Sequence, residues 1–283
     1  LYAYTAIEVP TGINFGTMTP TSIQVQSINA PSGLNYGSSG LLIENTTKGT
    51  NSGWKRDNNP WTSGSLSPNT SYSFRAKARN GDSLVTDYSP TVSKYTLANS
   101  PNSAAFSNET QSCIRANWAV NSNPGWTEYL CENTTTGINS GWIINTYWDN
   151  CGLACGTSYS FRVKTRNGNG VETAWTSLGS QSTSVCPPPS PPINVSASDG
   201  TFMDKVGVTW TASSGATSYT VYRATSKWGT KIAIGSTGGT TYEDTTASVM
   251  VTYYYYIKAT NPYGTSGYSA YNTGYRSDGR PPS

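Results

Sequence analysis

The chain reads Ser71-Tyr-Ser-Phe-Arg-Ala-Lys-Ala-Arg-Asn-Gly81 and, at an offset of 87 (158 minus 71), Ser158-Tyr-Ser-Phe-Arg-Val-Lys-Thr-Arg-Asn-Gly168. The stretch Glu44-Asn-Thr-Thr-Lys-Gly-Thr-Asn-Ser-Gly-Trp54 recurs at an offset of 88 (132 minus 44) as Glu132-Asn-Thr-Thr-Thr-Gly-Ile-Asn-Ser-Gly-Trp142. Two long segments repeated at nearly one spacing indicate that a unit of about ninety residues has been copied, and this length fits one small domain. The chain is therefore a tandem repeat.

Alternation of apolar and polar residues with period two predicts β-strands throughout the chain. It is clear in residues 23–28, 72–78 and 206–210, and no segment keeps a helical period. Asn-Gly pairs such as Asn80-Gly81 and Asn167-Gly168 separate the runs and suit tight hairpins that need positive φ. This rhythm is typical of small antiparallel β-sandwiches.

The residues before each Asn-Gly pair resemble a known domain family. The first module resembles the fibronectin type III signature around its tyrosine corner in Leu66-Ser-Pro-Asn-Thr-Ser-Tyr72, followed by Phe74, Ala76 and Ala78. The matching residues of the later modules are Leu153, Tyr159, Phe161, Val163 and the core tryptophan Trp118, and then Ala247, Tyr253, Tyr255, Ile257, Ala259 and the core tryptophan Trp210. The resemblance implies an all-β chain of three tandem fibronectin type III, immunoglobulin-like, antiparallel β-sandwiches.

Two departures from the family pattern concern the first and third modules. The first carries Ile23 or Val25 where the family has a tryptophan, and the third has Val249-Met-Val251 in place of the usual Pro-Gly-Thr. We expect the fold to be kept despite these departures.

The repeats also predict where each module begins and ends. We expect a first module at residues 8–98, a second, containing the disulfides, at 99–186, a third at 187–276, and a linker to a further module at 277–283. The proline-rich start of the third module predicts an extended, semi-rigid spacer.

Residues 1–7 resemble the end of the first module, with Tyr4 aligned to Tyr95 at an offset of 91. One interpretation is that they are the last strand of a preceding module in a longer array. The other is strand exchange, in which Tyr2, Tyr4 and Ile7 complete a sheet in a neighbouring subunit.

Composition excludes several classes of function. The chain of 283 residues is 12% charged, with a net charge of +3 and a mean hydropathy of -0.47, and it contains no run of Lys and Arg. We therefore expect no nucleic-acid binding, which needs a basic stripe, and no membrane span within the segment. The chain has no histidine, so a Ser-His-Asp or Cys-His arrangement cannot form, and its carboxylates are scattered. We expect neither an enzyme nor a cofactor.

All five cysteines lie in the second module, which predicts an oxidising, extracellular or cell-surface location. We favour bridges of Cys113 with Cys186 and of Cys151 with Cys155, leaving Cys131 over. The alternative is that the cysteines are reduced and pack as small apolar residues.

Two segments carry side chains that can bind metals. The segment Cys151-Gly-Leu-Ala-Cys155 lacks a second cysteine pair or a histidine to complete a tetrahedral zinc site. The segment Asp199-Gly-Thr-Phe-Met-Asp204 lacks the ligand density of a calcium loop. We expect no metal.

Aromatic side chains give the candidate contact surface. Alternation in the third module places Tyr222, Tyr254 and Tyr256 on the outer face of one sheet, where they could stack on sugar rings or anchor a protein. Cross-strand pairing that merely stabilises the sheet is the alternative. The repeated Trp54 and Trp142 also invite a carbohydrate platform, although residues copied with a module are more often core or edge-covering elements.

Together these features predict a structural or adhesive extracellular segment. The Thr- and Asn-rich style resembles the arrays of secreted and cell-surface bacterial proteins. The modules would act as spacers or form a filament, with self-association or neighbouring modules as the main partners. The alternative function is that of carbohydrate-binding accessory modules in a large secreted polysaccharide-degrading enzyme.

Overall fold

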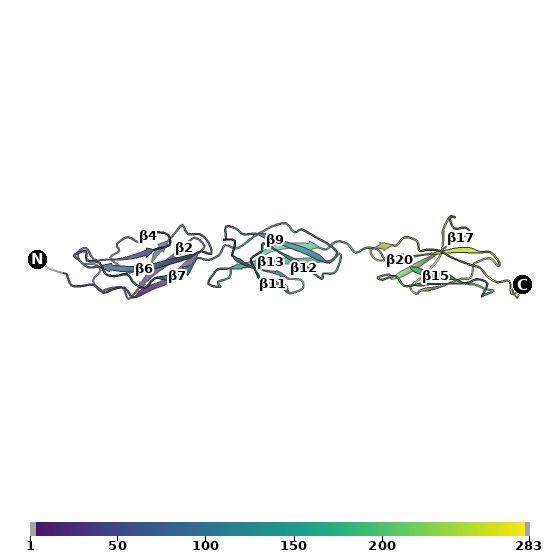
Figure 1. The fold of residues 1–283 in the computed structure, drawn as a ribbon, viewed down its shortest axis with the longest axis horizontal. Helices are drawn as coiled ribbons and strands as arrows, with labels where there is room; N and C mark the ends of the chain where they lie inside the picture. Colours follow the sequence, from purple (N-terminus) through teal and green to yellow (C-terminus); the bar gives the residue numbers. More distant parts are fainter. Residues whose placement is uncertain (1–3, 281–283) are drawn as a thin grey trace. The chain divides into compact units, whose positions relative to one another are not determined.

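The computed structural model describes residues 4–280, which form β-strands and no helix (Figure 1). The chain divides into two compact units, residues 1–184 and residues 185–283. The first unit contains two β-sandwiches, modules 1 and 2, and the second contains a third, module 3. None of the described residues belongs to a helix long and apolar enough to cross a bilayer.

Module 1 pairs a three-stranded sheet with a four-stranded sheet, all antiparallel. The first sheet has the order β1-β2-β5, with β1 at Gly12–Thr19, β2 at Ser22–Ile28 and β5 at Trp61–Ser63. The second has the order β4-β3-β6-β7, with β4 at Thr50–Asn51, β3 at Gly40–Asn45, β6 at Ser71–Arg79 and β7 at Val92–Tyr95. Every second residue of β6 is buried, as its alternation predicts.

Module 2 repeats this arrangement. One sheet has the order β12-β9-β8, with β12 at Tyr147–Cys151, β9 at Cys113–Ala119 and β8 at Asn102–Ser103. The other has the order β11-β10-β13-β14, with β11 at Ile138–Ile143, β10 at Glu128–Asn133, β13 at Ser158–Arg166 and β14 at Thr176–Ser182.

Module 3 has the same two layers. One sheet has the order β15-β16-β19, with β15 at Ile193–Ala197, β16 at Val206–Thr211 and β19 at Thr241–Asp244. The other has the order β18-β17-β20-β21 with β22 also paired to β20, where β18 is Ile232–Thr237, β17 is Ser218–Ala224, β20 is Tyr253–Asn261, β21 is Gly264–Thr265 and β22 is Asn272–Gly274. The described residues thus form three tandem antiparallel sandwiches with fibronectin type III strand order.

Two turns recur in every module and are named here by the strand letters of the fold. The E–F turn precedes the long strand β6, β13 or β20 and comprises residues 64–70, 152–157 and 245–252. The F–G turn follows that strand and starts from Asn80, Asn167 and Asn261.

Tyrosine corners close the E–F turns of modules 1 and 2. The hydroxyl of Tyr72 accepts a hydrogen bond from Ser67 N, and that of Tyr159 accepts one from Ala154 N, both at 2.9 Å. In module 3, where the turn sequence departs from the family, the Tyr253 hydroxyl instead pairs with the Ser248 hydroxyl at 3.2 Å. The fold tolerates this change because the buried polar tip of the tyrosine still has a partner.

The cores differ in how they fill the tryptophan position. Trp118 and Trp210 are buried in modules 2 and 3. In module 1, Ile23 and Val25 are both fully buried, and Phe15 packs against the module 1 core. Aliphatic residues therefore replace the tryptophan without loss of the sandwich.

The pairs Asn80-Gly81 and Asn167-Gly168 do not serve as the sequence predicted. Gly81 and Gly168 do not have positive φ; the left-handed residues of these turns are Ser83 and Gly170. A Cβ on Gly168 would lie 2.5 Å from the ring of Tyr95. Glycine is needed there for close packing of a ring on the backbone, not for a hairpin conformation.

Residues 4–11 form no strand and lie along module 1. Ile7 packs against the module 1 core, and Tyr4 N donates to Asp82 Oδ2 at 2.9 Å. Tyr2, the third residue of the predicted strand exchange, lies outside the described residues.

Candidate interaction sites

A buried asparagine joins module 1 to module 2. Asn69, in the E–F turn of module 1, is 1% exposed. Its Nδ2 donates to Thr127 Oγ1 at 2.9 Å, and its Oδ1 accepts from Gly168 N at 2.8 Å. Both ends of one side-chain amide are thus paired with module 2, which fixes the position of the turn on that module.

A second asparagine holds the chain that enters module 2. Asn167 Nδ2 donates to the carbonyl of Thr96 at 3.0 Å. Its Oδ1 accepts from the backbone N–H groups of Asn169 and Val171 at 3.0 and 2.9 Å, which orders the F–G turn. One side chain therefore orders its own turn and binds the segment that enters module 2. We call this residue the clasp asparagine.

Aromatic packing completes this joint. The ring of Tyr95 lies on Gly168 and meets the ring of Trp126 edge-on, with centroids 5.9 Å apart. The backbone N–H of Tyr95 donates to Asn169 Oδ1 at 3.0 Å. The joint thus combines hydrogen bonds with a stacked ring, and its polar groups are satisfied.

The clasp asparagine occurs in all three modules. Asn80 Nδ2 donates to the carbonyl of Thr5 at 3.2 Å, and Asn261 Nδ2 donates to that of Pro187 at 3.3 Å. The sequence indicates Asn80 and Asn167 only as turn residues. Their recurrence eight residues after the corner tyrosine was the available signal.

The tyrosine face of module 3 consists of five side chains on the outer side of the larger sheet. They are the predicted Tyr222, Tyr254 and Tyr256 together with Tyr268 and Tyr271, which sequence analysis missed. Their ring centroids are 5.0 to 5.9 Å apart. The two additional tyrosines come from the segment between β21 and β22, a connection that strand alternation cannot place.

Tyr256 lies on this face but is covered. It is 5% exposed, and its hydroxyl donates to the carbonyl of Lys227. Burial, and next the neighbouring tyrosines, raise the pKa of Tyr256 above its usual value. The accessible part of the face is instead formed by Tyr268 and Tyr271, each more than a third exposed.

Lysines border the tyrosine face. Lys258 lies 4.2 Å from the ring centroid of Tyr268, and Lys231 lies 4.6 Å from that of Tyr256. Lys227 lies 4.8 Å from the ring of Trp228, whose side chain is 85% exposed. Cation–π contacts of this kind hold the ammonium groups over the rings while leaving them accessible to solvent.

In module 1 the same face of the sheet is occupied by internal contacts. Arg79 stacks on Trp54 with its guanidinium carbon 4.5 Å from the ring, and Arg75 pairs with Glu44 at 2.7 Å.

Module 2 repeats both contacts. Arg166 lies 4.4 Å from the ring of Trp142, and Arg162 pairs with Glu132 at 2.7 Å. The repeated tryptophans and glutamates therefore stabilise their own modules, and they do not form an open row of rings.

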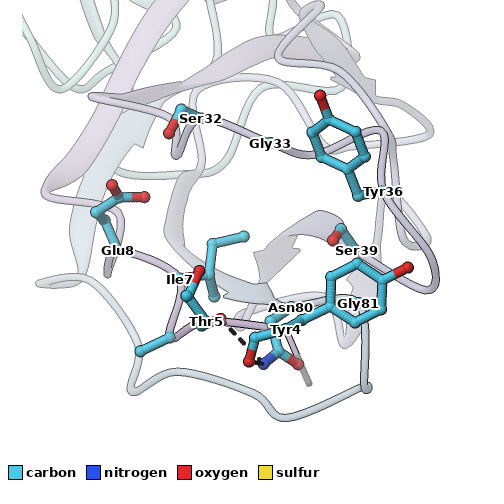
Figure 2. Close-up of a pocket in the computed structure, with 11 residues that line it drawn as sticks. Tyr4, Thr5, Ile7, Glu8, Ser32, Gly33, Tyr36, Ser39, Asn80 and Gly81 are labelled. Atoms are coloured by element: carbon cyan, nitrogen blue, oxygen red, sulfur yellow. Dashed lines mark hydrogen bonds between the residues drawn. The ribbon is translucent and has the colours of Figure 1, made fainter. Parts of the chain in front are cut away.

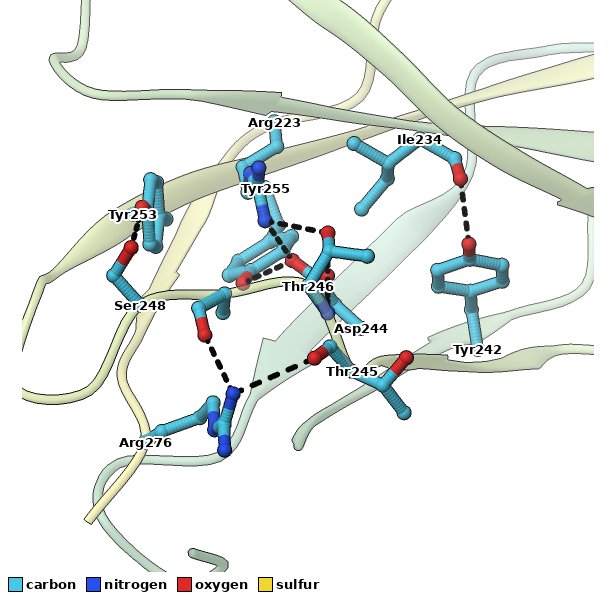
Figure 3. A network of polar contacts seen from close by, with 11 residues as sticks. Arg223, Ile234, Tyr242, Asp244, Thr245, Thr246, Ser248, Tyr253, Tyr255 and Arg276 are labelled. Atoms are coloured by element: carbon cyan, nitrogen blue, oxygen red, sulfur yellow. Dashed lines mark hydrogen bonds and ion pairs between the residues drawn. The ribbon is translucent and has the colours of Figure 1, made fainter. Parts of the chain in front are cut away.

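A buried carboxylate lies at the centre of a polar network in module 3 (Figure 3). Asp244 is 1% exposed, and its Oδ2 accepts from Arg223 Nη1 at 2.8 Å and from the Tyr255 hydroxyl at 2.9 Å. Its Oδ1 accepts from the backbone and hydroxyl of Thr246 at 2.9 and 2.7 Å. Burial opposes ionisation of Asp244, but these donors outweigh it, and the pKa lies below its usual value. The network holds β19 to β17 and β20.

The disulfide pattern corrects the expected pairing. Cys113 is bonded to Cys151, not to Cys186, and the pairing of Cys151 with Cys155 is also wrong. Strands β9 and β12 are neighbours in one sheet, and their register places Cys113 directly opposite Cys151, with Cα atoms 4.1 Å apart. Cys155 and Cys186 are also disulfide-bonded.

The remaining cysteine, Cys131, is free and buried in the core of module 2. Burial raises the pKa of its thiol to about 12. Such a thiol is inert at neutral pH because almost none of it is thiolate. Within residues 4–280 no cluster of three His, Cys, Asp or Glu side chains is arranged to hold a metal ion.

Comparison with known proteins gives structural likenesses only. No protein-family model matches the chain, and no curated protein matches it. The crystal structure of chicken CNTN1 FN1–FN3 domains is 15% identical, with a TM-score of 0.30, over 95% of this chain and 98% of that one. A Fn3-like protein from Clostridium thermocellum is 28% identical, with a TM-score of 0.30, over 33% of this chain and 98% of that one. The strand order and registers described above carry the fold assignment.

Proposed function

We propose that the chain is a structural segment of an extracellular or cell-surface protein, whose modules act as spacers and make protein–protein contacts. The observation that carries this proposal is the Asn69 joint between modules 1 and 2. A flexible tether would need no buried hydrogen bonds between modules, whereas a spacer of fixed geometry does. The disulfides support an oxidising location, because such bonds are rare in reducing compartments.

The tyrosine face supports the contact part of the proposal. Tyrosine and tryptophan are enriched at protein interfaces, where a large rigid ring contributes contact area at low entropic cost. Tyr271 supplies such a ring within the face, and Trp228, which contacts the same Lys227 ammonium, supplies another. A filament formed by strand exchange has less support, because Tyr4 and Ile7 are already engaged with their own module.

The test of the spacer function is the orientation of module 2 relative to module 1, measured in the full chain by residual dipolar couplings. We expect one alignment tensor to fit both modules. Asn69→Ala removes the two hydrogen bonds that the Asn69 side chain makes with module 2 and should yield two different tensors. The matched control is Asn139→Ala, which loses a single turn hydrogen bond to Gly141 N in module 2. Two independent tensors in the unaltered chain would overturn the spacer proposal.

Carbohydrate binding by accessory modules is the second candidate, and the exposure of Trp228 favours it. An indole that is 85% exposed, and that contacts the same Lys227 ammonium as Tyr271, offers a flat surface on which a sugar ring can stack. Titration with soluble polysaccharides, followed by tryptophan fluorescence, tests this candidate. A saturable change that is lost in Trp228→Ala would support it, and no change across the panel would reject it.

A further inference from the structure

A hollow of about 220 Å³ lies at the F–G end of module 1 (Figure 2). Ser39, Asn80 and Gly81 line it together with Tyr4 and Thr5 of the entering segment. Ser39 and Asn80 are each 4% exposed. We call this hollow the module 1 socket.

Five residues of the socket correspond to the part of module 2 that receives Asn69. The offsets of the repeat align Ser39, Asn80, Gly81, Tyr4 and Thr5 with Thr127, Asn167, Gly168, Tyr95 and Thr96 of the module 1–2 joint. Two of the joint's contacts are already present in module 1. The first is the hydrogen bond from Asn80 Nδ2 to the carbonyl of Thr5, which corresponds to that from Asn167 to Thr96. The second is the packing of the Tyr4 ring on Gly81, which corresponds to that of Tyr95 on Gly168.

The two groups that bind the asparagine side chain in module 2 have equivalents without partners in module 1. In module 2, Thr127 Oγ1 accepts from the amide of Asn69 and Gly168 N donates to its oxygen. The equivalents are the hydroxyl of Ser39 and the backbone N–H of Gly81. Within residues 4–280 neither has a hydrogen-bond partner. An N–H donor and a hydroxyl acceptor that both lack partners match the two ends of one primary amide.

We infer that the module 1 socket receives an asparagine from the E–F turn of another fibronectin type III module. This deepens, and rests on, the proposed spacer function. The partner is recognised by its chemistry: an asparagine in left-handed conformation, three residues before a corner tyrosine, as Asn69 stands before Tyr72 with φ of 45°. Its amide would donate to Ser39 Oγ, and its oxygen would accept from Gly81 N.

The occupant is an additional module and not a second copy of this chain. Asn69 is already bound within its own chain. The equivalent positions of modules 2 and 3 are Gly156 and Met250, both with positive φ, and neither carries an amide side chain. No E–F turn of this chain therefore has an asparagine free to offer.

The test places a second copy of residues 8–91 directly before residue 1 of the full chain, so that residues 1–4 take the place of 92–95. Amide hydrogen exchange of Gly81 is measured by NMR, with Gly168 as the internal reference. We expect exchange of Gly81 to slow at least tenfold in the extended chain. Changing the added copy's equivalent of Asn69 to Ala should restore the original rate. Ser39→Ala should weaken the protection without unfolding module 1.

Three outcomes would contradict this inference or the proposed spacer function on which it rests. If the added module is folded by its own core protection and Gly81 still exchanges at the original rate, the socket proposal is wrong. If Gly81 becomes protected in the unextended chain as concentration rises, the occupant is a second copy and the assignment to an additional module fails. If Gly168 itself is unprotected, the spacer function fails independently of the socket.

Discussion

Asp244 shows how one buried charge can determine the pH range of a module. Its carboxylate receives four hydrogen bonds inside module 3, and Arg223 supplies the compensating charge. Removing one partner of such a buried pair leaves the other uncompensated, which typically costs about 3 to 5 kcal/mol.

We predict that module 3 loses stability in acid because of Asp244. Its folded pKa lies below the unfolded value, so its contribution is complete above about pH 4 and is lost as the pH falls through the folded pKa. Asp244→Asn should lower the free energy of unfolding by about 3 kcal/mol at pH 7 and flatten the acid dependence. Urea titrations at several pH values, followed by NMR signals of β20, measure both effects.

The matched control is Glu243→Gln, the neighbouring position on β19. Glu243 pairs with Lys205 at 2.6 Å but is largely exposed, so its loss should cost less than about 0.5 kcal/mol. Equal losses in the two variants, or an unchanged acid dependence in Asp244→Asn, would show that the buried network does not carry this stability.

Among the elements, the pair β9 and β12 is fixed covalently. The Cys113–Cys151 bond closes a loop of 38 residues. In the chain-entropy model a loop of this length stabilises the folded state by about 4 kcal/mol.

We therefore expect the double variant Cys113→Ala, Cys151→Ala to destabilise module 2 by about 2 to 4 kcal/mol. Module 1 has no cysteine and serves as the control within the same molecule. Hydrogen exchange with mass spectrometry reports on peptides of β13 and β6 separately. A loss shared equally by both modules, or no loss in module 2, would contradict the assignment of this bond as a local constraint.

Strand alternation and the tyrosine corner were enough to predict the sandwiches, because every second residue of strands such as β6 must face the core. The disulfide pairing was missed because it depends on β9 and β12 lying side by side in register, which spacing along the chain does not reveal. The positions of Tyr268 and Tyr271 on the tyrosine face were not predicted for a similar reason, because both residues lie in an irregular segment to which strand alternation does not apply. The joint was not predicted because the two hydrogen-bond partners of Asn69, Thr127 and Gly168, lie 58 and 99 residues after it in the sequence.

At the scale of the whole molecule, the modules should unfold under force as separate units, since each has its own core. The 38-residue loop of module 2 cannot extend while its disulfide is intact. We expect the extension released by module 2 to grow by about 130 Å in the Cys113→Ala, Cys151→Ala variant, at roughly 3.4 Å per residue.

Single-molecule pulling on the full chain measures these steps, and the step of module 1 should be the same in both proteins. An unchanged module 2 step in the variant would mean that the loop is not locked in the native molecule.

The contact between modules 1 and 2 also affects how an array of fibronectin type III modules can grow by gene duplication. A module like module 1 carries the E–F turn with its asparagine at one end. At the other end it carries the clasp asparagine and the glycine that bind the E–F turn of a neighbouring module. A copy inserted beside its parent therefore fits at once, without compensating mutations in either neighbour. A module with glycine at this position, as at Gly156 of module 2, lacks the amide side chain and cannot offer this contact to a neighbour.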